Sequence, residues 1–128
     1  MNAVVKEFLK KHVWALATMG DCPNVVPVGT TCITDDEKLL LGDVLMETTV
    51  ANVKATGKAA VCAWDNETGE GYQIKGSAVY ETSGANYERL RDAVLQQSQG
   101  SMYLKGIVVV TPEETIVVTP GPENKVRL

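Results

Sequence analysis

The sequence has little of what most catalytic sites are built from. It contains one histidine, His12, and three cysteines, Cys22, Cys32 and Cys62, with no CxxC pair. We expect free thiols and no metal site, because a zinc site built on histidines needs more than one in the chain. A Ser-His-Asp or Cys-His arrangement would have to use His12, which lies near the end of a predicted helix, where the helix dipole favours a basic residue. No catalytic side chain stands out, so difficult chemistry here would need a bound cofactor.

Positive charge and long apolar runs are also scarce. Acidic residues number 16 and Lys plus Arg 12, so the formal net charge is −4. Such a chain lacks the basic surface that nucleic acid binding requires. Its apolar runs span only a few residues, against the roughly 20 of a membrane-spanning helix. We therefore expect no nucleic acid and no membrane partner. The first residues lack the basic region, apolar core and cleavage site of a secretory signal, which predicts a cytoplasmic protein.

What is present is the composition of an ordinary globular domain. Hydrophobic residues make up 45% and charged residues 22% of the 128 residues. A chain of this length supports one hydrophobic core, so we expect a single domain over residues 1–128.

Hydrophobic periodicity predicts three helices and seven strands. The expected helices are 2–12, 48–56 and 83–97. The expected strands are 13–19, 25–34, 38–43, 58–65, 71–81, 107–111 and 115–119. Pro27 and Gly29 are unusual inside a strand and indicate an edge or bulge that something approaches closely. Short turns make consecutive strands antiparallel, and six or seven of them suggest a small barrel closed on itself, with fold class α+β, mainly β.

The segment 41–58, LGDVLMETTVANVKATGK, carries the clearest indication of a binding site. A strand runs into a short loop and then into a helix that opens at Thr48 and Thr49. Free backbone N–H groups and the positive end of the dipole favour an anion at such a helix start. Two interpretations follow: either Thr48 or Thr49 caps the helix, or their hydroxyls help to hold a phosphate. Gly57 is placed to end the helix.

This arrangement resembles the FMN-binding split barrels related to pyridoxamine 5′-phosphate oxidase, and most closely the small FMN-binding proteins and flavin reductases among them. The resemblance covers residues 3–118. It rests on the order and spacing of ALAT at 15–18, followed by a turn and PNVVPV, then TTVANV at 48–53 and YQIKGSA at 72–78. It implies a six- to seven-stranded antiparallel split barrel with flanking helices, FMN as cofactor, and a homodimer with the flavin at the interface. The implied activity is that of a flavin-dependent oxidoreductase or electron-transfer protein with a small-molecule or redox-protein electron donor or acceptor.

The resemblance also implies a set of cofactor-binding residues. The flavin ring would lie along the second strand, at Pro27, Val28, Gly29 and Thr30. The phosphate would be held where the third strand passes into the short helix, at Gly42, Asp43, Thr48, Thr49 and Asn52. The partner subunit would contribute residues around Met102 and Tyr103. The catalytic residues stay unknown.

One position departs from the family pattern. The family usually carries a basic residue where Thr48 stands, and here Glu47 precedes it, so a carboxylate would repel the phosphate unless it points into solvent. Compensation could come from Lys54, Lys75 or a basic residue of the partner chain. A second hypothesis follows from this departure: a non-enzymatic binding or interaction module on the same fold, which has lost flavin or binds haem or a deazaflavin. A haem would need His12, a Cys, a Met or a Tyr as its axial ligand.

Overall fold

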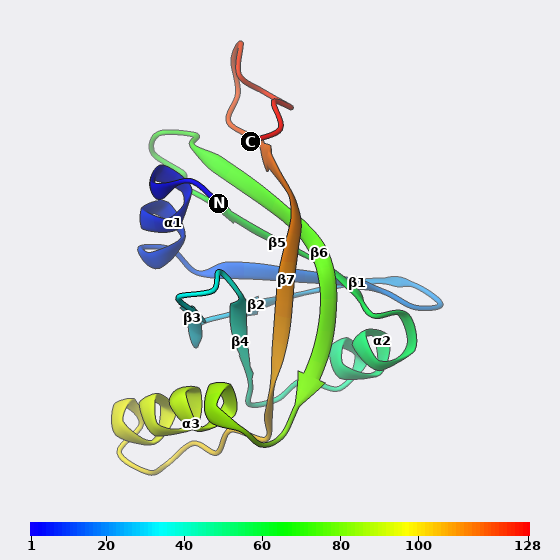
Figure 1. The fold of residues 1–128 in the computed structure, drawn as a ribbon, viewed down its shortest axis with the longest axis vertical. Helices are drawn as coiled ribbons and strands as arrows, with labels where there is room; N and C mark the ends of the chain where they lie inside the picture. The colour runs from blue at the N-terminus through cyan, green and yellow to red at the C-terminus, as the bar shows by residue number, and fades with distance from the viewer.

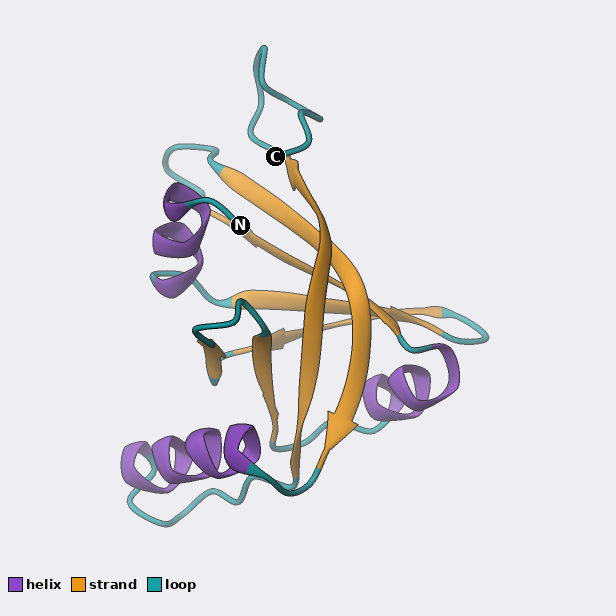
Figure 2. Ribbon diagram, viewed as in Figure 1, coloured by secondary structure: helices purple, strands orange, loops and turns teal.

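The computed structural model describes residues 1–128 as seven strands and three helices (Figures 1 and 2). In chain order they are α1 (Ala3–Lys10), β1 (Trp14–Met19), β2 (Pro23–Val28), β3 (Thr31–Ile33), β4 (Leu39–Asp43), α2 (Thr48–Thr56), β5 (Lys58–Trp64), β6 (Gly71–Glu81), α3 (Ala85–Gln97) and β7 (Gly106–Val117). The predicted class, α+β and mainly β, is confirmed. None of the helices is long and apolar enough to cross a membrane.

All seven strands belong to one antiparallel sheet with the order β2-β1-β5-β6-β7-β4-β3. The sheet curls strongly, so that β1 and β2 cross behind β6 and β7, while the helices lie around its margin (Figure 1). The expected closure was wrong, because β2 and β3 are edges and no ladder joins them. The architecture is a split barrel, as the resemblance implied.

Strand 25–34 was predicted as one element and is two. The chain leaves the sheet at Gly29 and Thr30, so that β2 pairs with β1 whereas β3 pairs with β4. The two halves therefore lie at opposite edges of the sheet. Pro27 is tolerated because β2 is an edge strand, which needs no full set of backbone donors.

The last two predicted strands are, in contrast, a single long β7. Its register with β6 shifts between Lys75 and Gly76, opposite Pro112, which marks a β-bulge. A Cβ on Gly76 would come within 1.9 Å of the Thr111 carbonyl oxygen, so only glycine fits this crossing. Pro112 lies beyond the last residue of β7 that pairs with β4, Val110, so its missing N–H costs the ladder little.

The main core fills the inside of the curled sheet beneath α1. Trp14 is buried there, and its indole N–H donates to the Leu9 carbonyl at 2.8 Å. The Asn2 side chain caps α1 by accepting from the Val5 N–H at 2.9 Å. A second cluster forms where α3 packs against β4 and β7: Leu40, Tyr87, Leu90, Val94, Leu104, Ile107 and Val109. Because both of its faces are covered, every residue of β4 is buried.

Candidate functional site

An apolar pocket of about 350 Å³ lies between the end of β2 and the loop that joins β4 to α2. Its walls are Val26, Pro27, Val28, Gly29, Thr30, Gly42, Val44, Leu45, Met46 and Met102. The structure thus brings together all four residues predicted for the ring end, and adds Gly42 and Met102 from the rest of the predicted set. Pockets of this size and apolar character are typical of small-molecule sites.

Two glycines shape this pocket in different ways. Gly29 faces open space, because a Cβ built on it would meet no atom within 4 Å. Gly42 allows a close approach, since a Cβ there would lie 3.0 Å from the Leu104 side chain and 3.3 Å from that of Thr30. The Gly42 N–H donates to the Thr30 carbonyl at 2.8 Å, which holds the two walls together.

The Asp43 carboxylate organises the loop that follows β4. The side chain is almost fully buried and accepts hydrogen bonds from the Met46 N–H at 2.7 Å and from the Tyr80 hydroxyl at 2.5 Å. Burial, together with this bond to a carboxylate, raises the pKa of Tyr80. Both Asp43 oxygens are therefore occupied within the protein, and the residue positions the loop next to the pocket.

The start of α2 has no side-chain cap. Its N-cap is Glu47, whose side chain makes no capping hydrogen bond, so the prediction that Thr48 or Thr49 caps the helix was wrong. The first internal bond runs from the Ala51 N–H to the Glu47 carbonyl, and the N–H groups of Thr48, Thr49 and Val50 have no acceptor within the protein. At the other end, Gly57 closes α2 in the left-handed conformation, with φ 66°, as predicted.

The two threonines of this helix start face opposite ways. Thr49 is 1% exposed, and its hydroxyl accepts from the Asn24 side chain at 3.0 Å. Asn52 is buried on the same face and donates to the Thr18 hydroxyl at 3.1 Å. These bonds dock α2 onto β1 and β2. Thr48 is exposed, so it is the threonine whose hydroxyl is free to meet a ligand.

The structure places the lysines that could supply positive charge to this site in three different environments. The Lys54 ammonium lies 5.3 Å from the centroid of the Tyr80 ring. Lys75 lies on the outer face of the sheet, away from the pocket. The residue that sequence reasoning missed is Lys105, whose ammonium lies 3.4 Å from the Met46 carbonyl in the loop before α2.

The loop residues Val44, Leu45 and Met46 were also missed, although the sequence held a signal for them. A run of three apolar residues in a loop is unusual, and Leu45 is 87% exposed. Met102 lines the pocket of its own chain, and Tyr103 beside it is 69% exposed. Whether a partner's copies of Met102 and Tyr103 reach the pocket stays a prediction.

His12 is held by structural contacts at the end of α1. Its ring stacks on Phe8 with centroids 4.0 Å apart, and Nδ1 lies 2.7 Å from the Phe8 carbonyl oxygen. Nε2 lies 3.5 Å from an Asp65 carboxylate oxygen. These contacts give His12 a structural role at the end of α1, and whether it ligates a haem stays a prediction.

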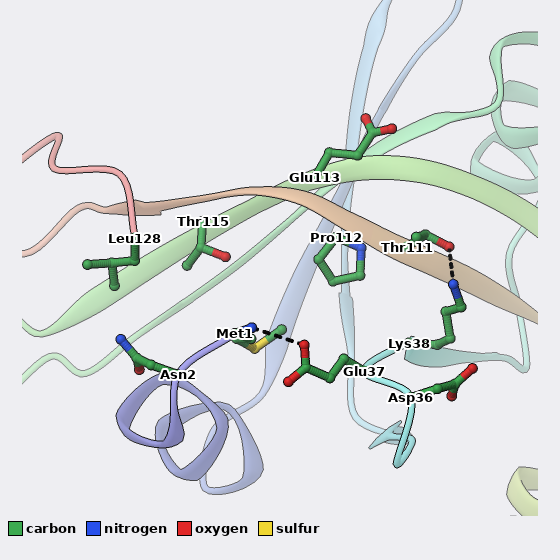
Figure 3. A pocket seen from close by; sticks show the side chains of 10 residues that line it. All are labelled: Met1, Asn2, Asp36, Glu37, Lys38, Thr111, Pro112, Glu113, Thr115 and Leu128. Carbon is green, nitrogen blue, oxygen red and sulfur yellow. Dashed lines mark hydrogen bonds and ion pairs between the residues drawn. The ribbon is translucent and has the colours of Figure 1, made fainter.

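A polar pocket of about 310 Å³ lies at the N-terminus, between the β3–β4 turn and β7 (Figure 3). Three of its charged groups have partners within the protein: the terminal ammonium pairs with Glu37 at 3.0 Å, and the Lys38 ammonium donates to the Thr111 hydroxyl at 3.2 Å. Bonds from Lys6 and the terminal ammonium hold the pKa of Glu37 below its usual value. This pocket lacks the apolar walls of the β2–β4 pocket.

The curled, open sheet and its edge pocket define a split-barrel protein. The family model of pyridoxamine 5′-phosphate oxidase matches residues 1–121. The chain therefore belongs to this family, which confirms the resemblance found in the sequence. No curated protein sequence matches the chain.

Solved structures agree with this fold. HupZ of Group A Streptococcus superposes with a TM-score of 0.81 at 23% identity, over 94% of this chain and 96% of that one. A Listeria innocua protein assigned as a pyridoxamine 5′-phosphate oxidase gives 0.74 at 19% identity, over 91% and 96%. An FMN-binding protein from Syntrophomonas wolfei subsp. wolfei gives 0.72 at 16% identity, over 82% and 76%. At these identities the similarity establishes the fold alone.

Proposed function

We propose that this protein binds FMN and acts as a flavin-dependent oxidoreductase or electron-transfer protein within its family. The observation that carries the proposal is an apolar pocket whose loop wall leads directly into the start of α2. An apolar pocket with glycine backbone at its walls opens beside a helix start whose first three N–H groups have no partner. A flat ring with an anionic tail matches such a pair of environments.

Different residues suit the ring and the phosphate of the cofactor. Val28, Val44 and Met46 provide apolar surface for the ring, while the open position at Gly29 lets a ligand approach the backbone closely. At the anionic end, the exposed Thr48 hydroxyl joins the unpaired N–H groups of α2. These donors are neutral, and a neutral hydrogen bond is about half as strong as a charge-assisted one.

Bound FMN would supply the redox chemistry, which this chain's side chains lack. The residues of the chain bind and orient the cofactor and keep water from its apolar face. Asp43 holds the loop in place through Met46 and Tyr80, so that the apolar loop residues stay beside the glycine wall. No side chain of the pocket is required to act as an acid or base.

The proposal includes a homodimer with the flavin at its interface. Two exposed apolar regions support a second copy: Leu45 and Tyr103 close to the pocket, and Met19 and Val25 on the outer face of β1 and β2. That outer face carries an apolar groove of about 690 Å³. Exposed apolar surface of this kind is typical of protein interfaces, and most soluble homo-oligomers are two-fold dimers.

The composition of the purified protein tests this function. An absorption spectrum, with mass spectrometry of any small molecule released on denaturation, is expected to show FMN bound to part of the protein. Reconstitution should restore the rest, since the neutral donors predict moderate affinity. Folded protein that carries no flavin and takes up none would refute the proposal.

One observation favours the second hypothesis, a module that has lost flavin. Glu47 stands at the N-cap with a carboxylate that repels a phosphate, and the Thr49 hydroxyl is buried against Asn24, where a ligand does not reach it. The same spectrum separates the two functions, because the module would stay colourless with added flavin.

A further inference from the structure

The positive charge that an anionic cofactor needs is absent from the positions where the sequence pattern places it. Thr48 and Thr49 carry no charge, and Glu47 beside them is acidic. Lys54 lies over the Tyr80 ring, and Lys75 lies on the outer face of the sheet. Neither lysine makes a hydrogen bond or ion pair with the loop that leads into α2, whereas another cation of the fold lies against that loop.

Lys105, at the end of the segment between α3 and β7, is the lysine closest to the loop that leads into α2. Its backbone N–H donates to the Asp43 carbonyl at 2.9 Å. Its ammonium lies 3.4 Å from the Met46 carbonyl oxygen and 4.0 Å from an Asp43 carboxylate oxygen. The fold thus fixes the Lys105 backbone against the strand end and places its charge one residue before the N-cap of α2.

The contacts of Lys105 leave its ammonium able to take another partner. The side chain is 46% exposed, and it makes one hydrogen bond of 3.4 Å and one ion pair of 4.0 Å, both long. The Asp43 carboxylate already accepts from Met46 and Tyr80, and its 4.0 Å distance to the Lys105 ammonium is too long for a direct hydrogen bond, so it attracts the lysine without binding it tightly. An ammonium with three donors and few firm partners is suited to a phosphate.

We propose that Lys105, oriented by Asp43, is the cationic partner of the FMN phosphate; this inference rests on the proposed function and deepens it. Lys105 offsets the charge of Glu47 and makes the site selective for a phosphorylated flavin. Asp43, which the resemblance placed among the phosphate residues, then acts as a positioning residue for the cation.

Paired titrations with FMN and riboflavin test this role, because the two ligands share a ring and differ in the phosphate. Flavin fluorescence quenching is measured on flavin-free protein at low ionic strength. Lys105→Gln is expected to weaken FMN binding about ten-fold, the effect of losing a charge-assisted bond, and to change riboflavin binding less than about two-fold. Lys105→Arg keeps the charge and should stay within about three-fold of the wild type.

Lys10→Gln is the matched control, since it removes the same charge from an exposed site on α1. It should leave both affinities unchanged. Added salt should weaken FMN binding more in the wild type than in Lys105→Gln, because the ion pair is screened. Urea unfolding of each variant without flavin confirms that it is folded.

The outcomes separate the two proposals. Wild-type protein that binds FMN and riboflavin equally, or a Lys105→Gln variant that loses both ligands to the same extent or neither, would overturn the role of Lys105 while the flavin function stands. Wild-type protein that binds neither flavin would overturn the proposed function and this inference with it.

Discussion

Removing the Thr49 hydroxyl tests how the structure assigns the two threonines at the start of α2. Thr49→Val keeps the shape of a side chain that is 1% exposed, but leaves the Asn24 amide without its acceptor at 3.0 Å. A lost hydrogen bond of this kind costs about 1 kcal/mol, and Asn24 is half-buried, so water replaces part of the bond. Thr48→Val alters an exposed hydroxyl and should change the free energy of unfolding by less than about 0.5 kcal/mol.

Urea unfolding of flavin-free protein, followed by tryptophan fluorescence, measures both changes. In thermal unfolding of the same proteins, the melting temperature of Thr49→Val should fall by about 3–6 °C. A double-mutant cycle with Asn24→Ala should return a coupling energy of about 0.5–1.5 kcal/mol between the two side chains. FMN affinity should fall in Thr48→Val. Equal stability of Thr49→Val and wild type, a coupling near zero, or a larger stability loss in Thr48→Val would refute this assignment.

Three further predictions concern the bulge, alkaline pH and assembly. Gly76→Ala should cost more than about 2 kcal/mol in urea unfolding, because its Cβ would lie 1.9 Å from a backbone oxygen of β7. Gly29→Ala, which meets nothing within 4 Å, should cost under about 0.5 kcal/mol; similar losses would contradict the bulge argument. Burial, together with the hydrogen bond from its hydroxyl to the Glu70 carboxylate, raises the pKa of Tyr72 from 10.0 to about 12. The free energy of unfolding should therefore be unaffected by this group below pH 10 and should fall as the pH rises from 10 towards 12. The fall should be smaller in Tyr72→Phe, and identical urea curves for both proteins would count against it. Light scattering should find Val25→Glu monomeric and the exposed α1 control Val4→Glu dimeric; a dimeric Val25→Glu would exclude the outer face as the interface.

Much of the fold could be predicted because its signals are local. The alternation of mostly apolar and mostly polar residues along 71–81 predicted this strand with the bounds that β6 has in the structure. Helix α2 was also predicted with its observed bounds, and Gly57 supplied a stop with a positive φ. The errors came from pairing, which is not local. No local feature of residues 25–34 indicates that the two halves of this segment pair at opposite edges of the sheet. Pro112 was expected to end a strand, but β7 no longer pairs with β4 at this point, so a missing N–H is tolerated and the strand continues.

Some residues of the candidate site could likewise be predicted from the sequence, whereas others depend on contacts between distant segments. Pro27 to Thr30 and Gly42 could be placed together from the resemblance, and the structure gathers them in one pocket. The hydroxyl of Thr49 could not be assigned from sequence, because its partner Asn24 lies on another strand. Lys105 was missed for a related reason: it precedes β7, and only the pairing of β7 with β4 brings it to Asp43.

The central claim is that the pocket between β2 and the β4–α2 loop binds FMN. Calorimetric titration of folded, flavin-free protein with FMN tests it most directly. The account predicts saturable binding of one FMN per chain with a dissociation constant in the micromolar range, weakened by Thr48→Val. Absence of any binding heat or fluorescence quenching with folded protein at high micromolar FMN would contradict it.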